Sequence, residues 1–149
     1  MKVFAIRVSS LVAVFLVLSG PCFWCPEVAG ETGTALALGI GLEGYDYPYK
    51  VEFLPLTIEG QDVRMAYMDV PSDEEPNGKT VLLLHGKNFF GSYWKDTIRF
   101  LTGKGFRVIV PDQLGFGKSS KPNIHYSFHL LAANTKKLMD SLEIKQVVV

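Results

Sequence analysis

Three short, mostly apolar runs constrain the fold of this chain more than any other feature. They occupy residues 80–84, 106–110 and 146–149. Continuous apolar runs of this length are typical of strands that helices bury on both faces. Residues 92–103 and 127–142, which separate the runs, repeat apolar side chains at helical spacing. The alternation of strand and helix predicts an α/β fold with a mainly parallel sheet and right-handed crossovers.

The two helical segments carry signals at their ends. Ser92 and Ser127 are expected to cap the first and the second helix, and the first would end at Gly103 or Gly105. The apolar faces comprise Trp94, Ile98 and Leu101 in the first helix and Phe128, Leu131, Leu138, Met139 and Leu142 in the second. Both helices are therefore predicted to pack one stripe against the sheet.

A hairpin is predicted ahead of the first apolar run. Residues 51–58 and 63–70 alternate partly between apolar and polar side chains around Gly60 and Gln61. Residues 71–79 form a polar turn cluster. The hairpin would face the core with one side.

The first thirty residues predict a signal peptide. Residues 8–18 are an apolar core that follows two basic residues and precedes two helix breakers. Cleavage could follow Gly30, where small residues stand at the required positions, or could occur earlier, because the segment between the apolar core and Gly30 is long. The flanking residues are Lys2, Arg7, Gly20 and Pro21. Residues 31–49 would be a lead-in segment. We expect a secreted or periplasmic protein with no stable membrane span after cleavage; the alternative is a membrane tether formed by an uncleaved segment, although a span needs about 20 apolar residues.

Charge and cysteine content exclude several function classes. Lys and Arg total 15, as do Asp and Glu, so the chain lacks the basic excess of a nucleic-acid binder. Cys22 and Cys25 would leave with the signal peptide, and no second pair could complete a zinc site. His125 and His129 have helical spacing but lack a third ligand. No metal site is predicted.

The loops after the first two apolar runs carry the most specific motifs. The first, residues 85–91, reads HGKNFFG, and the second, residues 111–122, combines Asp112 with a Gly-x-Gly-x-Ser motif. The order of strand, His-Gly, helix, strand, Asp, Gly-x-Gly-x-Ser, helix and strand resembles the α/β-hydrolase family. The resemblance implies that residues 50–149 are the N-terminal half of an α/β-hydrolase domain.

The resemblance also implies roles for individual residues. The backbone N–H of Lys87 would be a donor of the oxyanion hole, in a loop shaped by His85 and Gly86. The residues expected to line the substrate pocket are Asn88, Phe89 and Phe90, although the two phenylalanines could equally serve lid or core packing. The structural loop residues would be Asp112, Gly115, Gly117 and Ser119.

The catalytic nucleophile is not found in this chain. In the family a Gly-x-Ser-x-Gly elbow follows the strand that residues 146–149 begin, and the acid and the base come later. No serine here occupies such a motif; Ser119 comes nearest, but Lys121 stands at the second glycine position. We expect an N-terminal fragment, truncated before the nucleophile elbow and inactive alone, and whether Val149 is the true C-terminus stays open.

The leading functional interpretation is an exported hydrolase that cleaves an ester, amide or related bond through a nucleophile–His–acid triad, without a cofactor. Its substrate would be a partly apolar small molecule or peptide. One alternative is a non-catalytic binding protein of the same fold. A second is a nucleotide-binding protein, because Gly117, Lys118 and Ser119 match the end of a phosphate loop. Asp112 replaces the first glycine of that motif, and the next helix begins only near Ser127.

Overall fold

The computed structural model describes residues 38–149 of the chain. The predicted signal peptide, its alternative as a membrane tether and the two cysteines lie outside these residues. Residues 38–50 contain no helix or strand. No helix within residues 38–149 combines the length and the hydrophobicity that crossing a membrane demands.

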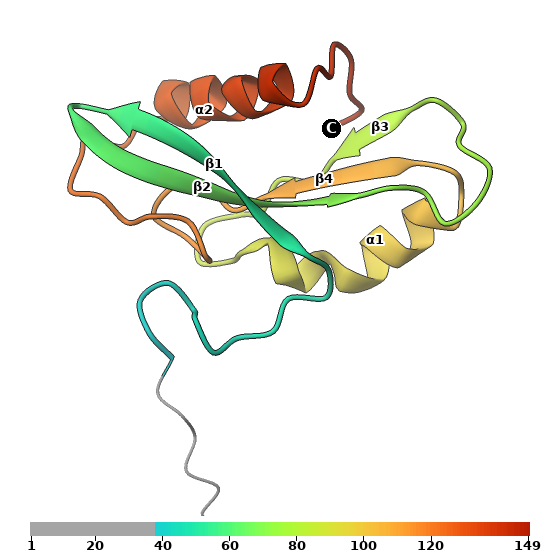
Figure 1. The fold of residues 1–149 in the computed structure, drawn as a ribbon, viewed down its shortest axis with the longest axis horizontal. Coiled ribbons are helices and arrows are strands. Elements are labelled where there is room, and N and C mark those ends of the chain that lie inside the picture. The colour runs from blue at the N-terminus through green and yellow to red at the C-terminus, as the bar shows by residue number, and fades with distance from the viewer. Residues whose placement is uncertain (1–37) are drawn as a thin grey trace, which may run out of the picture. The chain divides into compact units, whose positions relative to one another are not determined.

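A four-stranded mixed sheet forms the centre of the fold (Figure 1). Its strands are β1 (Val51–Ile58), β2 (Gln61–Val70), β3 (Thr80–Leu82) and β4 (Arg107–Pro111), in the order β1-β2-β4-β3. The β1–β2 and β2–β4 pairs are antiparallel, and β3 pairs parallel with β4. The predicted α/β class and the hairpin are confirmed, whereas the sheet in the described residues is mixed and not mainly parallel, because only β3 and β4 pair in parallel as strands.

The hairpin turn consists of two residues with left-handed backbone conformation. Glu59 and Gly60 have φ values of 48° and 74°. Two-residue turns of this kind match the right-handed twist of the strands that they join. The turn sets the register in which Ile58 pairs with Gln61 and Val51 with Met68.

The two α-helices cover opposite faces of the sheet, as Figure 1 shows. Helix α1 (Lys95–Thr102) follows a 3₁₀ turn, η1 (Gly91–Trp94), and α2 (Phe128–Ser141) is the longer helix. Leu138 of α2 packs in one core cluster with Ile109, whereas Ile98 of α1 packs in another with Val108 and Val110. Neighbouring residues of β4 thus point to opposite cores, as expected for a strand buried on both faces.

One of the two predicted helix caps is confirmed and one is wrong. The Ser127 side chain accepts a hydrogen bond from the Leu130 N–H at 3.1 Å. Ser92 lies inside η1 and caps nothing; Phe90 precedes that turn, and neither η1 nor α1 has a side-chain cap. The apolar stripe of α2 needs one correction as well, because Phe128 is 88% exposed.

The segment after α2 lies beside β3, where the third parallel strand was expected (Figure 1). The Leu82 N–H donates to the Val148 carbonyl at 2.8 Å, and the Val148 N–H donates to the Thr80 carbonyl at 2.9 Å. Only one parallel bridge forms, between Val81 and Val148. The expectation that helices bury this run on both faces is wrong within residues 38–149, since Val148 and Val149 are 55% and 80% exposed.

Candidate functional site

The loops that follow β3 and β4 meet at one edge of the sheet, because the two strands are parallel. His85 joins them: its Nε2 accepts a hydrogen bond from the Gln113 N–H at 2.9 Å. Its Nδ1 lies 3.0 Å from the Gly86 carbonyl oxygen. Since Nε2 is the acceptor, Nδ1 carries the hydrogen and donates it to that carbonyl. The ring is therefore held as the neutral Nδ1–H tautomer.

A tight turn places Lys87 at the tip of the first loop. The Phe89 N–H donates to the Gly86 carbonyl at 3.2 Å, and Asn88 has a φ of 70°. A positive φ at the third position, with Lys87 at an ordinary φ, fits a type II turn. Within residues 38–149 the Lys87 N–H donates no hydrogen bond. This donor is thus available at the edge of the sheet.

The two phenylalanines of this loop have different surroundings. Phe89 is 53% exposed and its ring contacts Tyr93. Phe90 is partly buried against two aromatic rings of the segment before β1, with centroids 5.3 Å away for Tyr45 and 5.8 Å away for Tyr47.

Asp112 is the buried centre of the second loop and is 1% exposed. Its carboxylate accepts three hydrogen bonds: from the Tyr47 hydroxyl at 2.5 Å, the Gly91 N–H at 2.6 Å and the Lys118 N–H at 2.8 Å. Burial, together with the Asp112 carboxylate, raises the pKa of Tyr47 well above its ordinary value. Tyr47 therefore stays protonated and acts as a donor.

Gly117 and Ser119 of the second loop pack around Asp112. A Cβ on Gly117 would lie 2.0 Å from Asp112 Oδ2, so no larger residue fits there without movement. Ser119 Oγ donates to the Asp112 carbonyl at 2.6 Å and accepts from the Ala66 N–H at 2.8 Å. Ser119 is 1% exposed, and this pairing gives its hydroxyl a structural role.

The same contacts oppose the nucleotide-binding alternative. A phosphate loop uses its backbone N–H groups to hold the anion. Here the Lys118 N–H is already bound to the Asp112 carboxylate. A phosphate at this position would meet a buried negative charge.

A cavity of about 660 Å³ lies between the two loops. Its walls include His85, Gly86 and Lys87 from the first loop, Gln113, Gly115, Phe116 and Lys121 from the second, and Tyr126, Ser127, Phe128 and Leu131 before and on α2. No acidic side chain is among them. Asn88, Phe89 and Phe90 are not among them either, and their contact with a substrate stays a prediction.

Lys121 lines this cavity, but its ammonium group already donates two hydrogen bonds to the protein. It donates to the carbonyl oxygens of Gly117 at 2.7 Å and Ser119 at 3.1 Å. Burial lowers its pKa, an effect that the nearby Asp112 charge opposes.

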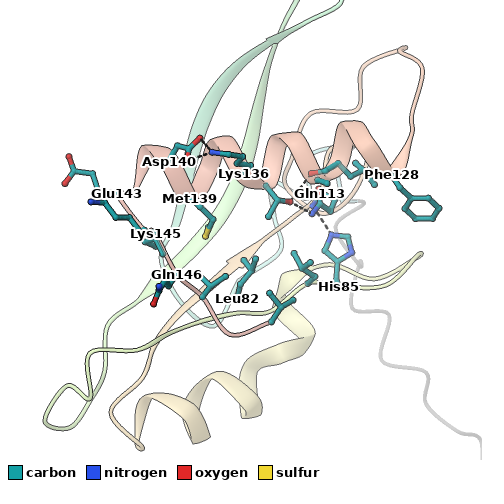
Figure 2. Close-up of a pocket in the computed structure, with 17 residues that line it drawn as sticks. Leu82, His85, Gln113, Phe128, Lys136, Met139, Asp140, Glu143, Lys145 and Gln146 are labelled. Atoms are coloured by element: carbon teal, nitrogen blue, oxygen red, sulfur yellow. Dashed lines mark hydrogen bonds and ion pairs between the residues drawn. The ribbon is translucent and has the colours of Figure 1, made fainter.

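A second hollow of about 1460 Å³ runs between α2 and the C-terminal segment. Figure 2 shows His85 and Gln113 at the end nearest Phe128, and Lys145 and Gln146 at the opposite end. Gln113 is fixed there because its Nε2 donates to Thr135 Oγ1 of α2 at 2.9 Å. His85 and Gln113 thus border both hollows.

Sequence reasoning missed two residues of this site. Gln113 directly follows Asp112, but nothing in the pattern indicates that its N–H binds a histidine. Tyr47 lies 65 residues before Asp112, in a segment without periodic signal. His125 and His129 are exposed, and residues 38–149 bring no three potential metal-ligating side chains together.

Comparison with known proteins identifies the fold. Residues 79–149 match the model of the alpha/beta hydrolase fold family. A haloalkane dehalogenase from Mycolicibacterium paratuberculosis is 38% identical over 80 residues, which are 52% of this chain and 25% of that protein. Epoxide hydrolase A from Mycobacterium tuberculosis is 34% identical over 76 residues, covering 50% of this chain and 24% of the relative.

Solved structures agree. A Pseudomonas aeruginosa protein described as a probable hydrolytic enzyme superposes with a TM-score of 0.71 at 49% identity, over 73% of this chain and 35% of that one. A haloalkane dehalogenase from Paraglaciecola agarilytica gives a TM-score of 0.60 at 30% identity, over 68% and 34%. The chain thus spans about a third of the length of these proteins, or less. It belongs to the α/β-hydrolase fold family, and its described residues correspond to the N-terminal portion of that fold.

Proposed function

We propose that this chain is the N-terminal part of an exported hydrolase that cleaves an ester, amide or related bond. The nucleophile, the acid and the base would come from residues that follow Val149 in a longer protein. The observation that supports this proposal most is the Lys87 N–H, which has no partner within residues 38–149 and lies in a loop that the His85–Gln113 hydrogen bond ties to the loop after β4. A donor fixed before the reaction is what stabilises a developing oxyanion best.

The loop of residues 85–91 would contribute a fixed hydrogen-bond donor to the reaction and no group that transfers a proton. His85 would not be the general base, because its Nε2 is engaged by the Gln113 N–H. The Lys87 N–H would donate to the oxygen on which negative charge accumulates during attack. The Lys87 side chain, which is exposed, is not needed for that role.

The proposed substrate is partly apolar and small enough for the cavity of about 660 Å³. Relatives named for haloalkanes and epoxides support compact substrates. Phe116, Phe128 and Leu131 give the cavity wall its apolar part. The bond class is best determined with a panel that contains a 4-nitrophenyl ester, an aryl amide, an epoxide and a haloalkane.

Lys87→Pro in the full-length gene product tests the oxyanion role. Proline lacks the N–H but is favoured at the second position of a type II turn, so the loop should keep its shape. Lys87→Ala, which keeps the N–H, is the matched control. We expect kcat of Lys87→Pro to fall about 100-fold or more, as for other oxyanion donors, and that of Lys87→Ala to change little. Equal kcat values for Lys87→Pro and Lys87→Ala would refute the role.

Two alternatives, a non-catalytic binding protein and a membrane-tethered protein, predict different experimental results. A mature protein that binds panel compounds but turns none over would be a non-catalytic binding protein. Export predicts that the protein purified from its native source has lost about 30 residues, which intact mass spectrometry measures. An intact N-terminus in the membrane fraction would favour the tether instead.

A further inference from the structure

The segment before β1 reaches the proposed oxyanion loop at its far end. Gly86 to Phe89 form the turn that carries Lys87, and Phe90 follows directly. The Phe90 ring lies against Tyr45 and Tyr47, with centroid distances of 5.3 and 5.8 Å. The loop is therefore held at its start by His85 and at its end by aromatic rings from a segment about 40 residues earlier.

One buried carboxylate connects this contact to the backbone. Asp112 Oδ1 accepts from the Gly91 N–H at 2.6 Å, while Oδ2 accepts from the Tyr47 hydroxyl at 2.5 Å. Because Tyr47 binds the second oxygen, the carboxylate cannot rotate without losing a hydrogen bond. The Lys118 N–H at 2.8 Å adds a third restraint, and the Lys118 ammonium lies 4.9 Å from the centre of the Tyr47 ring.

The Gly91 end of the loop has little room to adopt another position. A Cβ on Gly91 would lie 3.1 Å from Asp112 Oδ1 and 3.1 Å from a methyl carbon of Val110. Gly91 is buried, four residues after Lys87. A shift of the Asp112 carboxylate would therefore be passed to the Gly91 backbone, which ends the loop that carries Lys87.

We propose that Tyr47 is a positioning residue that fixes the oxyanion loop through Asp112 and Phe90. The proposal rests on the proposed function for the role of the loop, whereas the restraint of the loop by the Tyr47 hydroxyl can be tested without any activity. Tyr47 touches no reacting atom. Its hydroxyl orients the carboxylate that holds Gly91, and its ring supports Phe90.

The test compares Tyr47→Phe with Tyr45→Phe in the full-length protein. Both variants lose one hydroxyl and keep the ring beside Phe90. The Tyr45 hydroxyl makes no hydrogen bond within residues 38–149, so its loss controls for the substitution itself. The readouts are amide hydrogen exchange of Gly91, kcat and KM for the best panel substrate, and the melting temperature.

We expect exchange at Gly91 to rise at least about tenfold in Tyr47→Phe and to stay at the wild-type rate in Tyr45→Phe. The kcat of Tyr47→Phe should fall about 10- to 100-fold with KM nearly constant, since a misplaced donor weakens transition-state binding alone. Wild-type exchange at Gly91 in Tyr47→Phe would overturn the proposal, as would an unchanged kcat or an equal loss in Tyr45→Phe. Should the wild type hydrolyse no panel compound, the proposed function fails, and the exchange rates still decide whether Tyr47 restrains the loop.

Discussion

Two polar side chains, the half-buried His85 and the buried Asp112, determine how the site's loops are held. Each acts mainly as a hydrogen-bond acceptor for backbone N–H groups, the Gln113 N–H for His85 and the Gly91 and Lys118 N–H groups for Asp112. Buried donors that lose their acceptor cost about 1–3 kcal/mol each. These two side chains thus favour one loop conformation over the many that glycine-rich segments can adopt.

Tyr47 should make stability depend on alkaline pH. Burial and Asp112 raise the pKa of Tyr47 in the folded protein. Above about pH 10 an unfolded chain loses the tyrosine proton, while the folded chain keeps it. The folded state then binds more protons, so the free energy of unfolding must fall as pH rises, and it is unaffected by this group below that range.

Urea titrations of the wild type and Tyr47→Phe between pH 8 and 11 measure this effect. The wild type should lose up to about 1.4 kcal/mol more per pH unit above pH 10 than the variant, the limit for one proton. Tyr67 and Tyr126, whose pKa values are also raised by burial, contribute a slope common to both proteins. Parallel stability curves would show that Tyr47 ionises equally in both states.

At the scale of elements, the two serine caps show what local sequence can and cannot predict. Ser127 caps α2, since its side chain accepts a hydrogen bond from the Leu130 N–H of the first turn. Ser92 has the same local signal, but Gly91 is drawn to Asp112, a residue 21 positions away. The chain therefore starts a 3₁₀ turn at Gly91, and α1 begins only at Lys95. The hairpin and the strands were predictable from periodicity, whereas this boundary depends on a tertiary contact.

Alanine substitutions at the two serines test that explanation. Ser127→Ala should lower the free energy of unfolding by about 1 kcal/mol, the usual value of an N-cap. Ser92→Ala should change it by less than about 0.5 kcal/mol, as for surface sites without special contacts. Urea denaturation of both variants at neutral pH gives the two values. A loss at Ser92 equal to that at Ser127 would contradict the assignment of the caps.

At the scale of the whole molecule, the fold class and the two loops of the site were predictable from the sequence, whereas the contacts that hold these loops in place were not. The alternation of apolar runs and helices sufficed for the α/β class, and the His-Gly and Gly-x-Gly-x-Ser loops for the family resemblance. The contact between Tyr47 and Asp112 spans 65 residues and joins a segment without periodicity to a loop. No local pattern encodes such a pair, so only the folded arrangement reveals it.

The C-terminal edge of the sheet predicts how the 149-residue chain behaves by itself. Val148 pairs with β3 on one side through a single bridge, and no strand of residues 38–149 covers the other side. Val148 and Val149 are more than half exposed, and Val149 borders the hollow of about 1460 Å³. Exposed apolar edges of this kind pair with other chains. Sedimentation velocity at increasing concentration should therefore show self-association of this chain.

Val149→Lys should weaken that association, because a lysine on an edge strand opposes pairing. Phe100→Lys is the matched control. Phe100 is an exposed apolar residue as well (64%), but it lies on α1, which covers the face of the sheet opposite to α2. We expect Val149→Lys to shift the sedimentation distribution toward monomer and Phe100→Lys to leave it near that of the wild type. A wild-type chain that stays monomeric at all concentrations and melts cooperatively would mean that the edge is not a pairing surface. An equal shift in both variants would assign the association to general apolar exposure instead.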